Sequence, residues 1–166
     1  MKERELTKYP EIISYECTKK IMDQMQKNIC KIEIDDKKGT GFFCKIPFPT
    51  KDKMLNIFIT SNHIINKETL FHKSQIMITI EEEKKHKKIN LINRKKYTNK
   101  EYDITIIEIK EEDEINNYIE LDDNIINDIL NINKNNEYKD KTIYIMQYPE
   151  GELSVSYGIL DGIIYS

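Results

Sequence analysis

The chain of 166 residues is long enough for one well-packed domain or two small adjoining ones. With 39% hydrophobic and 33% charged residues, it has the composition of a folded protein, not of a disordered or fibrous one. A formal net charge of −3 excludes the strongly basic field typical of proteins that bind nucleic acid or anionic membranes.

The N-terminus and the cysteines bear on location. The first ten residues, MKERELTKYP, are charged and lack the apolar stretch of a secretory signal. No run in the chain approaches the ~18 apolar residues that a membrane-spanning helix needs. Cys17, Cys30 and Cys44 are an odd number without CxxC spacing, which indicates neither a disulfide framework nor a zinc site. We therefore expect a cytoplasmic protein with buried free thiols and with no metal or cofactor.

Residues 10–27 predict an amphipathic helix that leads into the rest of the chain. Apolar side chains recur there at helical spacing, with polar residues between them. The apolar positions are Ile12, Ile13, Cys17, Ile21, Met22 and Met25.

From Ile29 onward, short β-prone runs alternate with polar turns, which is typical of an all-β barrel or sandwich. A turn is expected over 35–39, a loop over 47–53 and a solvated hairpin turn over 81–88. Residues 111–140 are polar and favour a connector, with one or two helical turns over 125–130. The expected strands begin near Ile29 and cover 55–59, 75–80, 88–91, 104–109, 142–146, 153–160 and 163 onward.

Four motifs of glycine, aromatic and β-branched residues occur in a fixed order. They are 39–43 (GTGFF), 58–65 (FITSNHII), 102–107 (YDITII) and a hairpin made of 148–151 (YPEG) and 154–159 (SVSYGI). Each motif alone is weak, but their order and spacing are fairly specific, with His63 and Asp103 lying 40 residues apart. Over roughly residues 29–164, the set resembles the trypsin-like (chymotrypsin-fold) serine peptidase domain, above all its disulfide-free intracellular and bacterial branches.

The resemblance implies an all-β, chymotrypsin-like double β-barrel with an N-terminal helix. It divides the chain into a helical segment over 1–27, a first barrel over 28–112 and a connector over 113–139. Residues 140–166 would begin a second barrel that is incomplete.

The resemblance also implies catalytic roles for His63 and Asp103. His63 would act as general base and then as general acid, because imidazole exchanges protons near neutral pH. Asp103 would stay ionised, orient the imidazole ring and stabilise its protonated form. Asp103 directly precedes an apolar run, where an ionised carboxylate needs a partner.

The nucleophile of this family lies in a Gly-x-Ser-Gly-like loop that also supplies oxyanion-hole N–H groups. No Gly-x-Ser-Gly or Gly-x-Cys-Gly occurs in the 166 residues. We therefore expect a serine-type or cysteine-type nucleophile beyond the C-terminus, and no endopeptidase activity from the chain as it stands. The expected partner is a peptide or protein substrate, without nucleic acid or membrane.

Two other interpretations stay open. His63 could be an ordinary strand-end histidine and Asp103 a turn-capping aspartate, in a small all-β domain unrelated to peptidases. The chain could instead be a non-catalytic, peptidase-like module that binds peptides, proteins or further copies through open strand edges. His72, His86 and the lysines of 84–88 are expected to be solvated.

Overall fold

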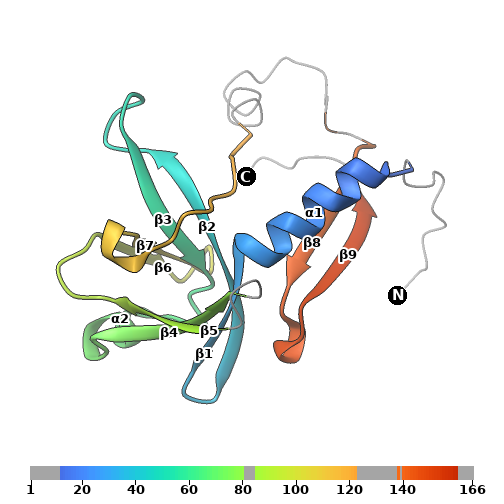
Figure 1. Ribbon diagram of the computed structural model, residues 1–166. Coiled ribbons are helices and arrows are strands. Elements are labelled where there is room, and N and C mark those ends of the chain that lie inside the picture. Colours follow the sequence, from blue (N-terminus) through green and yellow to red (C-terminus); the bar gives the residue numbers. More distant parts are fainter. Residues whose placement is uncertain (1–11, 81–84, 123–137, 139, 161–166) are drawn as a thin grey trace.

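The computed structural model describes residues 12–80, 85–122, 138 and 140–160. Their regular structure is mostly β-strand. The strands form a seven-stranded antiparallel sheet, which curls into a half-barrel, and a separate two-stranded hairpin (Figure 1). The longer helix, α1 (Tyr15–Lys27), lies beside the hairpin. A β-rich fold with a leading helix is thus confirmed, whereas the division into two barrels stays a prediction. In the described ranges, no helix is long and apolar enough to cross a bilayer.

The larger sheet follows a simple antiparallel order. In space, its strands are β5 (Lys85–Asn90), β4 (Gln75–Ile80), β1 (Ile29–Ile34), β2 (Lys37–Pro47), β3 (Met54–Thr60), β7 (Ile104–Glu108) and β6 (Lys96–Asn99). The strands expected over 55–59, 75–80 and 104–109 are confirmed to within one residue, and β5 begins three residues earlier than expected. The turn expected over 35–39 is tighter, because Asp35 adopts a positive φ of 55° and lets β2 begin at Lys37.

The alternation of apolar and polar residues places the core inside the curl of this sheet. In β4, Ile76, Ile78 and Ile80 are buried, and the residues between them point outward. Phe43 and Phe58, from neighbouring strands, meet at a ring-centroid distance of 5.3 Å. Further fully buried core residues are Ile32, Ile65, Ile89, Leu91 and Ile107.

The two glycines of the 39–43 motif are required by close packing. A Cβ on Gly41 would lie 2.2 Å from the Phe58 ring, and one on Gly39 would lie 2.6 Å from Ile64. Side chains at these positions would therefore push the core and the segment around His63 out of place. This accounts physically for the motif that the sequence analysis singled out.

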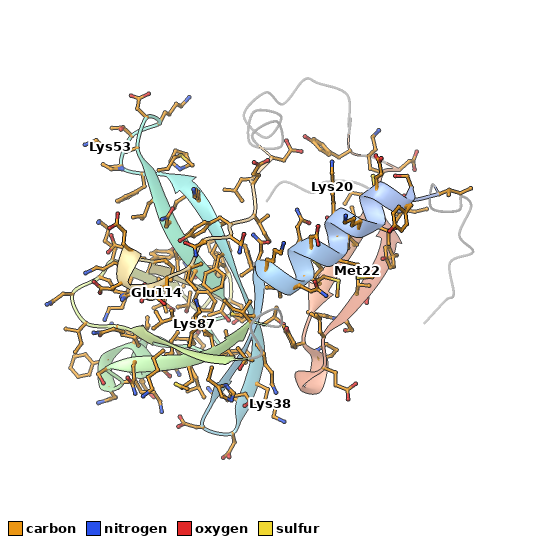
Figure 2. All side chains as sticks on the ribbon, in the orientation of Figure 1. Lys20, Met22, Lys38, Lys53, Lys87 and Glu114 are labelled. Carbon is orange, nitrogen blue, oxygen red and sulfur yellow. The ribbon has the colours of Figure 1, made fainter. Side chains whose placement is uncertain are left out.

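Helix α1 is shorter than expected because Ser14 caps it, accepting a hydrogen bond from the Cys17 N–H. The helix buries Ile21 and Met25, whereas Met22 (labelled in Figure 2) is 42% exposed. The expectation that all three thiols are buried is wrong for Cys17, because the first turns of α1 are exposed.

The hairpin beside α1 agrees with the expected strands over 142–146 and 153–160. It consists of β8 (Thr142–Gln147) and β9 (Ser154–Ile159), joined through a short 3₁₀ turn, η2 (Pro149–Gly151). The Tyr144 hydroxyl hydrogen-bonds the Gln24 side chain of α1 at 2.9 Å. Because this contact joins residues far apart in the chain, it helps hold the helix against the hairpin.

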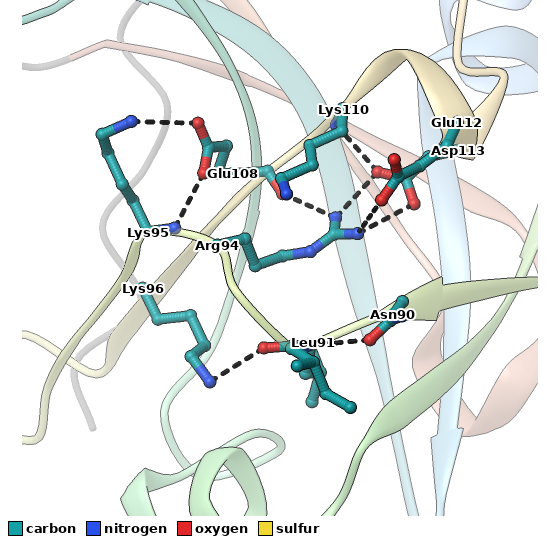
Figure 3. Close-up of polar contacts among 10 residues, drawn as sticks. Asn90, Leu91, Arg94, Lys95, Lys96, Glu108, Lys110, Glu112 and Asp113 are labelled. Atoms are coloured by element: carbon teal, nitrogen blue, oxygen red, sulfur yellow. Dashed lines mark hydrogen bonds and ion pairs between the residues drawn. The ribbon is translucent and has the colours of Figure 1, made fainter.

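A buried ion pair that the sequence analysis missed holds the β5–β6 connection (Figure 3). Arg94 Nη1 donates to Asp113 Oδ2 at 2.7 Å and to the Glu108 carbonyl at 2.8 Å, and its side chain is fully buried. Asp113 ends the 3₁₀ turn η1 (Glu111–Asp113) and also accepts the Lys110 N–H at 2.8 Å. One guanidinium therefore ties β7 and η1 to the β5–β6 loop.

Two further features complete the described fold. The short helix α2 (Lys67–His72), also missed from the sequence, is capped by Asn66, whose side chain accepts the Thr69 N–H. Lys87 of β5 donates to the Glu114 carbonyl at 2.8 Å, which brings the residue after η1 onto the sheet (Figure 2). The expectations for 10–11, 81–84, 125–130 and 163 onward lie outside the described residues.

Candidate active site

The sheet itself brings His63 and Asp103 to one place. His63 lies in the turn that follows β3, and Asp103 directly precedes β7. Because β3 and β7 pair antiparallel, with Thr60 opposite Thr105, the end of one strand adjoins the start of the other. Residues 40 positions apart in sequence therefore meet at one edge of the half-barrel.

The carboxylate of Asp103 makes two contacts with His63. Its Oδ2 lies 2.6 Å from Nδ1 of the ring, and its Oδ1 accepts the His63 backbone N–H at 2.8 Å. The Asp103 carbonyl accepts the Asn62 N–H at 3.1 Å. Since an ionised carboxylate only accepts hydrogen bonds, Nδ1 carries the hydrogen and Nε2 is left as the basic atom of the neutral ring.

The position of Asp103 favours its ionised form. Its backbone has a φ of 49°, a left-handed conformation that aspartate tolerates better than most residues, and its N–H donates to the Lys100 carbonyl at 3.3 Å. Hydrogen bonds from the backbone N–H and the ring of His63 hold the pKa of the Asp103 carboxyl below its ordinary value, and a weaker one comes from Ser61.

The turn that carries His63 is held from several directions. The N–H groups of Ile64 and Ile65 donate to the Ser61 carbonyl at 3.2 and 3.1 Å, and this closes the turn. Lys37 Nζ, from the start of β2, donates to the His63 carbonyl at 2.9 Å. The imidazole itself stays accessible, with 67% of the side chain exposed.

An open cleft of about 590 Å³ adjoins the pair. One wall comes from β2, β3 and the start of β7, and the other comes from β8. Its apolar lining residues are Phe42, Ile59, Ile64, Ile104, Ile145 and Met146. The imidazole thus faces a hollow that offers contact area to apolar groups of a bound molecule.

No nucleophile stands ready among the described lining residues of this cleft. Ser61, the serine in that lining, interacts with the Asp103 carboxylate and so lies on the Nδ1 side of the ring. His72 and His86 are exposed elsewhere, as expected, with the His86 ring 2.9 Å from Thr79 Oγ1. Within the part of the chain that the structure describes, no cluster of His, Cys, Asp or Glu could hold a metal ion.

Both site residues that the sequence analysis named are therefore in direct contact, and their catalytic roles stay predictions. The residues that hold the His63 turn were not predicted from the sequence. They are Lys37 and the polar side chains of Asn62, Thr98 and Thr105. The local signal for them was Thr105, a polar residue between the isoleucines of β7. Compared with protein-family models, with curated proteins and with solved structures, the chain matches none.

Proposed function

We propose that this chain carries the base and the orienting carboxylate of a trypsin-like (chymotrypsin-fold) serine endopeptidase. The observation that carries the proposal is the two-point contact of Asp103 with His63, through the ring Nδ1 at 2.6 Å and the backbone N–H at 2.8 Å. A carboxylate bound in this way fixes both the tautomer and the orientation of the imidazole, which is the requirement of a catalytic base.

The proposed chemistry follows from the atoms that are left available. Nε2 of His63 accepts the proton of a nucleophile as that nucleophile attacks a peptide carbonyl, and then donates it to the leaving amine. Asp103 stabilises the imidazolium that forms between the two steps, because its lowered pKa keeps it ionised. The exposed ring and the apolar cleft beside it suit an extended peptide with apolar side chains.

The nucleophile is the part that the 166 residues do not supply. Their sequence contains no Gly-x-Ser-Gly, and the described cleft offers no serine or cysteine on the Nε2 side of the ring. The proposal therefore requires a serine or cysteine on a further stretch of polypeptide, and it predicts that these residues alone do not cleave peptides.

Active-site labelling tests this proposal. The product of the natural gene, expressed in full, is treated with a fluorophosphonate probe, which reacts with an activated serine. We expect labelling of that product, loss of labelling in its His63→Ala variant, and no labelling of residues 1–166. A matched control is His86→Ala, because His86 is an exposed histidine on β5 whose ring contacts Thr79 and lies outside the cleft. Equal labelling of the His63→Ala variant would contradict the proposal, as would a stop codon directly after Ser166.

A second candidate function is peptide binding without cleavage. Three consecutive residues of β8, Ile145 to Gln147, line the cleft. Successive side chains of a strand point to opposite faces of the sheet, so the strand lies with its edge, and not with one face, toward the cleft. Among the described strands, β8 pairs only with β9. An extended peptide could add to such an edge by main-chain hydrogen bonds. Isothermal titration calorimetry of residues 1–166 with apolar peptides measures binding, and incubation of the same peptides with the full gene product measures cleavage. Binding without cleavage favours the peptide-binding function over the peptidase.

A further inference from the structure

Three side chains and one carbonyl form a chain of hydrogen bonds beneath the His63 turn. Asn62 Nδ2 is hydrogen-bonded to Thr98 Oγ1, which lies 2.9 Å from Thr105 Oγ1. Thr105 Oγ1 in turn lies 2.6 Å from the Ile65 carbonyl oxygen. The hydrogen-bond chain thus begins one residue before His63 and ends two residues after it.

The direction of every bond in this chain is determined by its ends. The Ile65 carbonyl can only accept, so the single hydroxyl hydrogen of Thr105 points to it. Thr98 must then donate its own hydrogen to Thr105, which leaves its oxygen free to accept from the Asn62 amide. Each hydroxyl donates once and accepts once, an arrangement in which neighbouring bonds strengthen one another.

Burial makes this arrangement hard to replace with water. Thr105 and Ile65 have exposed fractions of 0%, and Asn62 and Thr98 are half-buried. Removing one hydroxyl would leave buried polar groups of its neighbours unpaired, which costs more than the bond itself contributes.

The hydrogen-bond chain also connects the two halves of the candidate site. Thr98 on β6 is opposite Thr105 on β7 in the strand register, and Thr105 lies two residues after Asp103, which directly precedes β7. The two threonines therefore fix the backbone on both sides of His63 to the strand that begins beside Asp103.

We propose that Thr98 and Thr105 are positioning residues, which hold His63 so that its Nδ1–H meets the Asp103 carboxylate. The catalytic meaning of this role rests on the proposed function, but the role concerns the geometry of the pair and is measurable without any catalysis. In water, the side chain of free histidine prefers to carry its proton on Nε2. The Asp103 contact favours Nδ1–H, so the tautomer reports how well the ring is placed.

The test measures the ratio of the two tautomers of neutral His63 from ¹⁵N chemical shifts of the ring. It uses residues 1–166 at an alkaline pH above which these shifts no longer change. Asp103→Asn is the reference for a broken pair. In this variant, the side-chain oxygen of Asn at position 103 takes the place of Oδ1 and accepts the His63 N–H. The NH₂ group then faces Nδ1 of the ring. Because an NH₂ group can only donate, Nδ1 must accept and the ring hydrogen moves to Nε2.

The test variants are Thr105→Val and Thr98→Val, which keep side-chain size and remove the hydroxyl. The matched controls are Thr105→Ser and Thr98→Ser, which keep the hydroxyl, and Thr79→Val, which removes a hydroxyl bonded to His86. If Thr105→Val does not fold, the half-buried Thr98 still provides the test.

We expect each valine variant to lower the Nδ1–H to Nε2–H ratio of His63 about tenfold, the factor that corresponds to one lost hydrogen bond of about 1.4 kcal/mol. The serine variants and Thr79→Val should keep the wild-type ratio. An unchanged ratio in both valine variants, with a changed ratio in Asp103→Asn, overturns the positioning role and leaves the proposed function standing. A wild-type ratio already equal to that of Asp103→Asn overturns both.

Discussion

Asp113→Asn should destabilise the protein strongly, although it replaces only one oxygen by an NH₂ group. The Arg94 side chain is 0% exposed and that of Asp113 is 3% exposed, so the guanidinium has little water to replace a lost counter-charge. In the variant, the single amide oxygen can still accept hydrogen bonds from the Lys110 N–H and from Nη1 of Arg94. The new NH₂ group would then face Nη2, which donates to Asp113 Oδ1 at 3.2 Å in the native pair.

The size of the effect follows from this geometry. Breaking a buried ion pair by removing one partner costs about 3 to 5 kcal/mol. The Glu112 carboxylate, 3.7 Å from Nη2, compensates in part, so we expect about 3 kcal/mol. A urea m-value of about 2 kcal/mol/M converts this loss into a midpoint lower by about 1.5 M.

Urea unfolding followed by circular dichroism measures the effect. The control is Asp35→Asn, which removes the charge from an exposed pair with Lys73 at 2.8 Å and keeps a residue that tolerates the positive φ. Its cost should stay below about 1 kcal/mol. If Asp113→Asn costs no more than this control, the reasoning from burial is refuted.

Three further predictions concern acid, packing and thiols. Contacts with His63 lower the pKa of Asp103 in the folded protein below that of an ordinary aspartate, which is ~4. The stability that these contacts contribute is therefore present above pH ~4. It is lost as the pH falls through the pKa of Asp103 in the folded protein. Urea midpoints of wild type and Asp103→Asn should therefore converge on acidification, and a constant difference would contradict this. Gly41→Ala should cost about 1 to 3 kcal/mol by thermal or urea unfolding, because its Cβ would lie 2.2 Å from the Phe58 ring. A thiol reagent should modify Cys17 rapidly and the two buried cysteines only after unfolding, and rapid modification of all three would refute the assigned burial.

The strands could be predicted from the sequence where apolar and polar residues alternate, as in β4. The missed strand, β6, is four residues long and mostly polar, so its pairing with β7 depends on neighbours and not on its own pattern. Helix α2 was missed for a similar reason, because six residues are too few to show a helical period. Local patterns thus predict only those elements that are long enough to repeat.

The candidate site was predictable in part. His63 and Asp103 were found through a resemblance, since no local pattern links residues 40 positions apart. The side chains that hold the His63 turn could not be found in this way. Thr98 and Thr105 are common strand residues, and their role appears only when β6 and β7 pair. Arg94 and Asp113 were missed for the same reason, because their pairing depends on the tertiary fold.

The surroundings of His63 agree with the role proposed for it. A histidine kept for stability would bury its ring and gain packing, but this ring is 67% exposed while the backbone around it is held by Lys37, Asp103 and Thr105. The polar groups of Lys37, Asp103 and Thr105 are instead used to hold a turn that carries an exposed imidazole. Such a distribution of contacts contributes less to stability than a packed core would, and it places one basic nitrogen beside an open cleft. That pattern is what a site needs when it must present a proton acceptor to a molecule arriving from solution.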